Sequence, residues 1–580
     1  MTDHFKILKV DLAKGKSSVI RLEGRNEVAG GSGLAALIFN KFGFFDSPWN
    51  DPEQPLIFAI GPLTGYFPLM SKTVCSFKSP YHNQYTESHA GGRSALALCF
   101  AGFDALVITG RAVEPCCLAV GSRSLEIRPV RFLWGTDVLR TGKILRNMFK
   151  TASGHRSILR IGQAGENQLA MAGINADTYR HFGRLGGGAV MGAKNLKAIV
   201  INGDEILKRP GSKDYPGLYK KVFEQVTAKG MMKKYHDLGT PANIMSLNKL
   251  ESLPWRNLQA SSDPAAEGIS GERFARDALL RNIACAGCPV GCIHVGFVRE
   301  KFMEDNRYFY RQVAYDYEPI FATGSMLGVT SCFSVLSIMD VIEKVGLDVM
   351  SAGVALAWAT EATQRGLIGP DETIVPLKFG DAEAYKQAAF YLGTAANDFY
   401  ALLGQGTLRA AERYGGEEFA CVLGQEMAGY ATGELFFSAQ SLGFRHSHLD
   451  TGAYAYEQKH AERDVEKMVE FLIDDEAPRT FLTSMVACLF ARGVYTPQVL
   501  AECLHAVGYK ALADNVDSVA LYIRKLRWKT RFATGFDPDS ITIPKRFFKV
   551  KSWKGPVDPK CLEELKERYG QRLKEIVEGS

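Results

Sequence analysis

Apolar residues in the first third of the chain fall in short runs rich in β-branched side chains, and glycine or proline separates the runs. Examples are PLIFAIGPL (55–63), DALVITG (104–110) and KAIVING (197–203), and such runs are typical of strands. From about residue 212 the apolar positions recur three and four residues apart, as in residues 331–366, which indicates helices. The pattern predicts a mixed α/β fold, with an N-terminal β-rich sheet domain followed by two mostly helical domains.

The length of the chain supports a division into several domains. A chain of 580 residues is too long to fold around one hydrophobic core. We place the sheet domain at residues 1–207, the first helical domain at 208–420 and the second at 421–580. A turn-rich segment, SSDPAAEGISGE (261–272), separates helical stretches of the first helical domain.

Composition narrows the function only slightly. The formal net charge is +6, which for this length only weakly favours an anionic partner. The N-terminus has no basic start followed by an apolar stretch and a cleavage site, so it does not match a secretory signal. The longest nearly apolar stretch, 95–110, contains Asp104 and is shorter than the roughly 18 residues of a membrane span. We therefore expect a cytoplasmic protein without a membrane span.

Three of the twelve cysteines are clustered, in CAGCPVGC (285–292). A loop of this kind with Cys285, Cys288 and Cys292 is typical of a thiolate site for zinc or for an iron–sulfur cluster. A zinc site usually has a second C-x2-C pair or a histidine at finger-like spacing, and only His294 is close. The spacing favours an iron–sulfur cluster, whose cubane form needs a fourth thiolate that spacing does not identify. The scattered remaining cysteines favour a reducing compartment.

Two glycine-rich segments match nucleotide-binding loops only in part. GGSGLAALIF (30–39) lacks the third glycine of a dinucleotide-binding turn, and GRLGGGAVMGAKNLKAIV (183–200) lacks Gly-Lys-Ser/Thr, so neither is a Rossmann or Walker motif. The second segment with Arg184, and HAGGRSA (89–95) with Arg93, offer backbone N–H groups and a guanidinium to phosphate or another anion. Tight turns in a sheet domain are the alternative for both.

Taken together, these segments resemble the tungsten-containing aldehyde:ferredoxin oxidoreductases. The resemblance is carried by residues 160–203, CAGCPVGC, DYEPIFATGSMLG (316–328) and KVGLDVMSAGVALAWATE (344–361), and it extends from KILKVDLAKG near the start to residue 508. It implies a tungsten or molybdenum held by the dithiolenes of two pterins, Mg²⁺ bridging the pterin phosphates, and one [4Fe-4S] cluster. The cluster ligands that it implies are Cys285, Cys288, Cys292 and Cys488.

The resemblance also implies contacts to the pterins. Lys72 stands where an arginine usually bridges cluster and pterin, and lysine cannot fork between two partners as a guanidinium does. Two D-x-x-G-L-[CD] motifs of the family place acids on the pterin amino edges. The first reads Glu343 to Asp348 here, whereas the second, Thr483 to Cys488, has lost Asp, Gly and Leu, so contacts to one pterin should differ. The positions implied on the phosphate side are His89, Gly91, Gly92, Arg184, Gly186 and Gly187.

By the same resemblance, two side chains carry the chemistry. Glu318 in DYEPI is expected to act as general base or acid, and His448 in RHSHLD as hydrogen-bond donor to the substrate carbonyl, with His446 as the alternative. The implied activity is oxidation of aldehydes to carboxylic acids, or the reverse, with electrons passed through the cluster to ferredoxin or a small iron–sulfur subunit. A homo- or hetero-oligomer is expected. The sequence does not distinguish tungsten from molybdenum, or one aldehyde from another.

Two other functions stay open at this point. Some relatives of this family reduce the aromatic ring of benzoyl-CoA, although the match at Glu318 and His448 favours aldehyde chemistry. A nucleic-acid-binding protein with a structural zinc site is the other, because IRKLRWKTRF (523–532) and PKRFFKVKSWK (544–554) interleave basic and aromatic residues. We interpret these segments as an amphipathic helix and a basic loop, so no nucleic-acid partner is expected. The same residues could instead dock an acidic ferredoxin.

Overall fold

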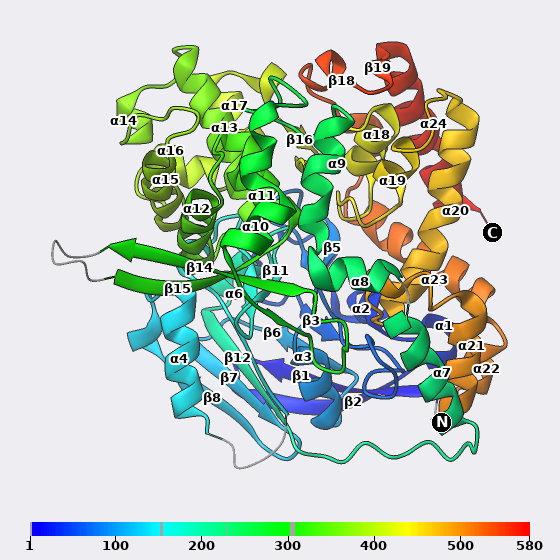
Figure 1. Cartoon of the computed structure of the whole chain (residues 1–580). Helices are drawn as coiled ribbons and strands as arrows, with labels where there is room; N and C mark the ends of the chain where they lie inside the picture. Colours follow the sequence, from blue (N-terminus) through cyan, green and yellow to red (C-terminus); the bar gives the residue numbers. More distant parts are fainter. Residues whose placement is uncertain (1–2, 151–154, 229, 302–307, 580) are drawn as a thin grey trace.

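The N-terminal third of the chain forms the base of the molecule, and helices cover it (Figure 1). The computed structural model describes residues 3–150, 155–228, 230–301 and 308–579. The blue and cyan strands lie together at the bottom of Figure 1, with the green helices above them on one side and the yellow to red helices on the other. This architecture confirms the predicted mixed α/β fold.

Two six-stranded sheets make up the N-terminal region. The first has the order β2-β1-β6-β3-β4-β5, with β1 and β6 parallel and the other neighbours antiparallel. The second has the order β11-β10-β9-β12-β7-β8, with β7 and β12 parallel. The strands are β1 (His4–Asp11), β2 (Lys16–Glu23), β3 (Leu56–Ala59), β4 (Thr73–Lys78), β5 (Tyr85–Ala90), β6 (Ala105–Thr109), β7 (Cys116–Gly121), β8 (Leu125–Pro129), β9 (His155–Arg160), β10 (Ile174–Ala176), β11 (Arg180–Phe182) and β12 (Leu196–Gly203).

The two sheets share one hydrophobic core. Phe58 of β3 and Phe182 of β11 pack edge to face, with ring centroids 5.7 Å apart. Strands β3, β4 and β6 are buried along their whole length, and burial on both faces explains their continuous apolar sequences. Strand β5 of the first sheet also contacts β11 of the second. The segments that carry His89 and Arg184 therefore lie at one junction between the sheets.

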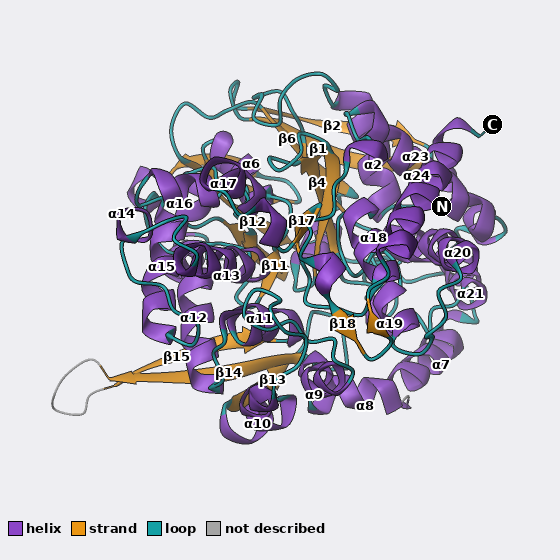
Figure 2. Ribbon diagram, turned by 90° about the horizontal axis from the view of Figure 1, so that it is seen from above, coloured by secondary structure: helices purple, strands orange, loops and turns teal. Residues whose placement is uncertain are grey.

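Helices of both later regions surround the strands, as Figure 2 shows from above. Helix α13 is buried along most of its length, including Trp358, as expected for a helix that is apolar on all sides. The domain boundaries given above remain predictions. The larger helices are α2 (Gly31–Phe42), α3 (Ser94–Phe100), α4 (Val138–Met148), α6 (Gly187–Ala193), α7 (Tyr215–Ala228), α8 (Gly230–Asp237), α9 (Asn243–Lys249), α10 (Gly271–Asp277), α11 (Tyr317–Thr323), α12 (Cys332–Val345), α13 (Val349–Gln364), α15 (Ala382–Thr394), α16 (Asp398–Leu403), α17 (Thr407–Tyr414), α18 (Glu434–Leu442), α19 (Ala453–Glu457), α20 (Val465–Ser484), α21 (Pro497–Val507), α23 (Val516–Ala533) and α24 (Pro559–Glu578).

A small antiparallel sheet, which the sequence pattern did not identify, interrupts the mostly helical first region. It has the order β13 (Leu279–Ile283), β14 (Ile293–Lys301) and β15 (Tyr308–Tyr315), and the β14–β15 hairpin extends beyond the body of the molecule in Figure 1. Alternating β-branched and aromatic residues favour these strands. The cysteine loop connects β13 to β14, and α11 follows directly after β15. The sheet thereby brings the cysteine loop close to the start of α11.

The basic segments near the C-terminus, proposed as a binding surface, are partly buried. Arg527, Trp528 and Arg531 of α23 are 4%, 0% and 2% exposed. Lys554 forms ion pairs with Glu434 at 3.3 Å and Glu457 at 2.6 Å. These buried and paired charges do not contribute to the binding face proposed for a nucleic acid or an acidic ferredoxin, whereas four lysines of the same segments are exposed: Lys529, Lys545, Lys549 and Lys551.

The described parts of the chain contain no single helix long and apolar enough to cross a membrane. Two consecutive helical segments, Tyr317–Leu327 and Cys332–Val345, reach the length and apolar composition of a membrane span only when taken together, and the pair is bent by 109°.

Candidate active site

The side chains singled out in the sequence converge on one cavity of about 710 Å³. Segments of all three regions line it: the end of β5, β11, the cysteine loop, the start of α11 and the loop after α18. Its volume is in the range that cofactors and small ligands occupy. The predicted site residues that line it are Lys72, His89, Gly91, Arg184, Cys285, Cys288, Cys292, Glu318, Glu343, Asp348, His448 and Cys488.

Three predicted glycines lie behind the cavity wall. Gly92 and Gly186 have φ values of 108° and 87°, in the left-handed region that glycine adopts without strain. A Cβ on Gly186 would lie 2.2 Å from Pro80 Cγ. Gly187 begins α6. These glycines shape the loops next to the cavity and do not line it.

The four predicted cluster cysteines lie together. Burial raises the pKa of Cys288 to about 12 and that of Cys292 to about 11, and neighbouring thiols, with Cys488 foremost among them, contribute to both increases. Among the described residues, no group of three or more His, Cys, Asp or Glu side chains could hold a single metal ion. His294, which follows the motif closely in sequence, faces the backbone carbonyls of His236 and Asp237 at 3.0 and 3.1 Å.

Backbone contacts hold both cysteine segments against the N-terminal domain. Gly287 accepts a hydrogen bond from the N–H of Leu69 at 3.1 Å, and the carbonyl of Leu69 accepts one from Cys488 at 3.0 Å. A Cβ on Gly91 would lie 2.7 Å from Cys285 Sγ, a distance that forces one group to move. Gly91 therefore allows the HAGG loop to approach the cysteine loop.

Two basic side chains face the thiols. Arg180, at the start of β11, donates from Nη2 to Cys292 Sγ at 3.9 Å. A Cβ built on Gly91, next to Cys285 Sγ, would lie 3.6 Å from Lys72 Nζ and 3.8 Å from Arg180 Nε. Burial raises the pKa of Cys285, but Arg180 and Lys72 outweigh it and hold that pKa below its usual value. Lys72 was predicted to lie near the cluster, whereas Arg180 was not.

Glu318 and His448 form a close pair. Glu318 lies in the first turn of α11, and its Oε1 is 3.0 Å from His448 Nε2 and accepts a 2.8 Å hydrogen bond from Tyr430 Oη. Burial raises the pKa of Glu318, but His448 and the two hydrogen bonds hold it below its usual value. Burial and the charge of Glu318 raise the pKa of the nearby Asp316 to about 6. The site thus contains an ionised carboxylate beside a carboxyl group that can hold a proton.

The alternative histidine, His446, does not line the cavity. Its Nε2 lies 2.6 Å from Arg531 Nη2 and its Nδ1 3.2 Å from the carbonyl of Gln440. Burial and Arg531 hold the pKa of His446 well below its usual value, so the ring is neutral. This geometry favours His448 over His446.

The predicted pterin-side acids line another part of the cavity. Asp348 caps α13 by accepting from the N–H and Oγ of Ser351 at 3.0 and 2.6 Å, and its Oδ2 lies 3.5 Å from Arg184 Nε. Burial, with the charges of Asp340 and Asp316, raises the pKa of Glu343 to about 8. Glu343 is therefore mostly protonated at neutral pH and can donate a hydrogen bond as well as accept one.

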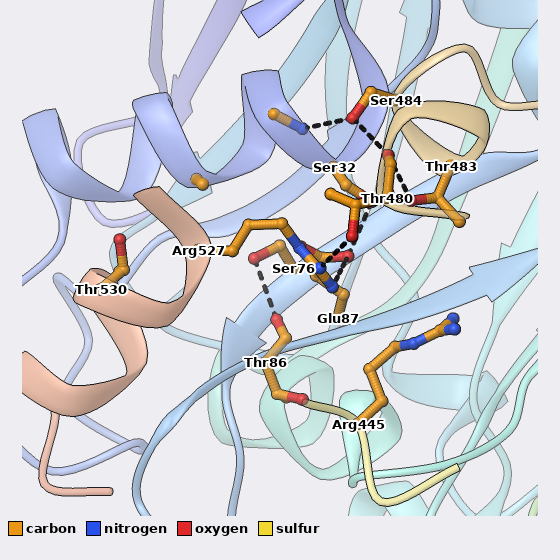
Figure 3. A network of polar contacts seen from close by, with 12 residues as sticks. Ser32, Ser76, Thr86, Glu87, Arg445, Thr480, Thr483, Ser484, Arg527 and Thr530 are labelled. Carbon is orange, nitrogen blue, oxygen red and sulfur yellow. Dashed lines mark hydrogen bonds and ion pairs between the residues drawn. The ribbon is translucent and has the colours of Figure 1, made fainter. Parts of the chain in front are cut away.

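A buried polar network that the sequence did not reveal lies beside the cavity (Figure 3). Glu87 of β5 lines the cavity and accepts hydrogen bonds from Arg527 Nε at 2.8 Å and from Ser32 Oγ at 2.8 Å. Ser32 Oγ also lies 3.0 Å from Thr483 Oγ1. Burial raises the pKa of Glu87, but Arg527 and His89 hold it well below its usual value. Arg527 thus keeps a carboxylate charged next to the degenerate second motif.

His89 is fixed by this network. Its Nε2 lies 3.0 Å from Glu87 Oε2 and its Nδ1 3.0 Å from Arg445 Nη1. Burial and Arg445 lower the pKa of His89 to about 4, so the ring is neutral at pH 7. Nε2 then carries the proton and donates to Glu87, and Nδ1 accepts from Arg445. Both ring nitrogens are occupied by protein partners.

Comparison with known proteins identifies the family. The family model described as "Aldehyde ferredoxin oxidoreductase, N-terminal domain" matches residues 7–203, and the model described as "Aldehyde ferredoxin oxidoreductase, domains 2 & 3" matches residues 217–573. The chain belongs to the aldehyde ferredoxin oxidoreductase family. It is therefore an oxidoreductase, and the family resemblance found in the sequence is confirmed.

Named relatives of the aldehyde ferredoxin oxidoreductase family match along much of the chain. A "Tungsten-containing aldehyde ferredoxin oxidoreductase" of Thermococcus kodakarensis is 28% identical over 95% of this chain and 92% of its own. The protein of that name in Pyrococcus abyssi is 33% identical over 65% of this chain and 62% of its own. The "Aliphatic sulfonate oxidoreductase, WOR-like subunit" of Pyrococcus furiosus is 29% identical over 70% and 66%.

One solved structure of a complex shares the fold. It is the "Active site complex BamBC of Benzoyl Coenzyme A reductase in complex with 1,5 Dienoyl-CoA", with a TM-score of 0.80, 20% identity, and coverage of 98% of this chain and 95% of that chain. At this identity the likeness concerns the fold alone.

The cavity wall fits the cofactors expected in an aldehyde ferredoxin oxidoreductase. Arg180 Nε, His181 Nε2 and His448 Nδ1 are buried without a hydrogen-bond partner in the described parts of the chain, and all three residues line the cavity. Buried polar groups are costly to leave unpaired, so these atoms suit a polar ligand. The four cysteines would hold the cluster, and Lys72, Glu343, Asp348, Arg184 and the 89–92 loop would contact the pterins.

Some residues of the aldehyde ferredoxin oxidoreductase site were missed in the sequence for different reasons. Residues two apart on a strand face the same side, so alternation along β5 places Glu87 beside His89 and would have revealed it. Arg180 lies within the segment that carries the resemblance, four residues before Arg184. No local signal marks Tyr430 or Arg445, which reach the cavity through the tertiary fold.

Proposed function

We propose that this chain is a tungsten- or molybdenum-dependent, bis-pterin aldehyde oxidoreductase that passes electrons through a [4Fe-4S] cluster. One observation carries the proposal: the Glu318–His448 pair and the four cysteines line the same cavity. The family and its tungsten-containing relatives support it. The twelve cysteines are all free, which fits the reducing cytoplasm that we propose as its location.

The reaction converts an aldehyde and water into a carboxylic acid, two protons and two electrons. The metal site supplies a centre that can take up both electrons. Glu318, ionised in the buried pair, accepts the proton released by water. His448 Nε2 faces Glu318 at 3.0 Å, which leaves Nδ1 of His448, when it carries a proton, to donate to the carbonyl oxygen of the aldehyde. In the reverse direction Glu318 returns its proton to the oxygen that leaves as water.

The cluster passes on one electron at a time, so the enzyme needs an external acceptor. We propose ferredoxin or a ferredoxin-like iron–sulfur subunit, and a homo- or hetero-oligomer. One relative is named as a subunit and the similar solved structure is a complex, which supports a subunit partner.

The first experiment is elemental analysis combined with an activity assay. Protein purified without oxygen should contain close to one tungsten or molybdenum per chain and about four irons, the content of one cubane. It should reduce a viologen dye with simple aldehydes. Zinc without iron or tungsten, or a metal-replete protein that oxidises no aldehyde, would contradict the proposal. Ring reduction of an aromatic CoA thioester in place of aldehyde oxidation would indicate the other chemistry.

Removing the Tyr430 hydroxyl should change the pH dependence of turnover. Tyr430→Phe removes a 2.8 Å hydrogen bond that favours the ionised form of Glu318, so the pKa of Glu318 should rise. A general base works only when deprotonated, and the acid limb of the kcat/KM profile should therefore move to higher pH. The measurement is the pH profile of the dye-linked rate at constant ionic strength. A lower rate with an unchanged profile would contradict this role of Tyr430.

A further inference from the structure

One guanidinium, that of Arg180, faces two of the four clustered cysteines. Its Nη2 donates to Cys292 Sγ at 3.9 Å. A Cβ built on Gly91 would lie 3.8 Å from Arg180 Nε and 2.7 Å from Cys285 Sγ. The Nε–H and Nη2–H groups belong to one rigid fork. The guanidinium thus bonds to one of these thiols, that of Cys292, and lies close to the second, that of Cys285.

Arg180 is a cation inside the protein, because a guanidinium stays protonated even where it is buried. Lys72 adds a second positive charge beside Cys285. Its ammonium is a single point of charge, whereas the guanidinium presents several N–H groups in fixed directions.

We propose that Arg180 is a positioning residue that raises the reduction potential of the [4Fe-4S] cluster by donating an N–H bond to the sulfur of Cys292 and by placing its positive charge close to the sulfur of Cys285. The inference rests on the proposed function, because it requires the cluster to be bound. Reduction adds an electron to the cluster, and a cation with N–H donors stabilises the more negative reduced form. Hydrogen bonds to the sulfurs and local charge are known determinants of such potentials.

The position of Arg180 connects this effect to catalysis. Arg180 lines the same cavity as the cluster cysteines, Asp316 and Glu318, so it lies close to both the proposed cluster and the proposed catalytic acid. A higher cluster potential favours the movement of electrons from the substrate site to the cluster. Lys72 presents a single ammonium on this wall, so the guanidinium of Arg180 supplies the planar group of N–H donors there.

The test is a potentiometric titration of the reduced-cluster EPR signal. Three proteins are compared: the wild type, Arg180→Lys, which keeps the charge but loses the fork, and Arg180→Gln, which loses both. The matched control is Arg281→Gln, because Arg281 is exposed, lies four residues before Cys285 and bonds to Gln312 at 2.9 Å. We expect the midpoint potential to fall in the order wild type, Arg180→Lys, Arg180→Gln, and to stay unchanged in the control.

The possible outcomes separate this inference from the proposed function. An unchanged midpoint in Arg180→Gln protein with about four irons per chain would overturn the inference. Loss of the cluster from both Arg180 variants, in folded protein that retains its tungsten or molybdenum, would show a structural role and overturn it as well. Absence of iron and of the EPR signal in the wild type would instead overturn the proposed function.

Discussion

Replacing Glu318 with glutamine should lower kcat for aldehyde oxidation by about 10²- to 10⁴-fold, the contribution typical of one general acid or base. Glutamine keeps the size of the side chain and an oxygen for the Tyr430 hydrogen bond, but it cannot take up the proton released by water. It also removes the negative charge that lies 3.0 Å from His448, so His448 Nε2 loses its anionic partner. The measurement is the dye-linked rate of anaerobically purified protein at saturating aldehyde.

The content of tungsten, molybdenum and iron serves as the control for this variant and should equal that of the wild type. Glu272→Gln is the matched variant, since Glu272 is also an acid in the first turn of a helix, α10, but is exposed and outside the cavity. It should retain full activity. Full turnover by a metal-replete Glu318→Gln protein would remove Glu318 from the mechanism.

The cysteine loop was predictable from local spacing, whereas its fourth member was not. Cys285, Cys288 and Cys292 lie within eight residues, and their glycines and proline mark a loop. Cys488 is almost 200 residues away, and only the family resemblance connected it to the others. In the structure Leu69 joins the two segments by backbone hydrogen bonds. Such a contact depends on the tertiary fold, and no local pattern reports it.

Two features of the fold show why periodicity alone misleads. Strands β14 and β15 have the two-residue alternation of an antiparallel hairpin, but they lie between long helical segments that dominated the pattern. Helix α23 carries enough basic residues to suggest a charged surface, yet Arg527 and Arg531 turn inward. Burial of a cation depends on a partner that is distant in sequence, here Glu87 of β5 for Arg527. Composition contains no information about that pairing.

Replacing Arg527 with methionine should destabilise the folded protein by about 3–5 kcal/mol, because it leaves Glu87 as a buried charge without its cation. The two side chains are 4% and 0% exposed, and both guanidinium contacts to the carboxylate, at 2.8 and 3.3 Å, are lost. Methionine retains part of the packing against Phe444. The measurement is the denaturation midpoint, and Lys529→Met, at an exposed position of the same helix, is the matched control.

A double variant and the pH dependence test the cause of this loss. In the wild type the folded-state pKa of Glu87 is depressed, so its stabilisation is present above the unfolded pKa of about 4.3 and is lost as the pH falls through the folded value. Without Arg527, burial raises the pKa of Glu87, and protonation should relieve the penalty. The deficit of Arg527→Met should therefore shrink between pH 7 and pH 5, and Glu87→Gln should restore part of it at pH 7. A deficit that neither acid nor Glu87→Gln reduces would mean that lost packing, and not the unpaired charge, destabilises the variant.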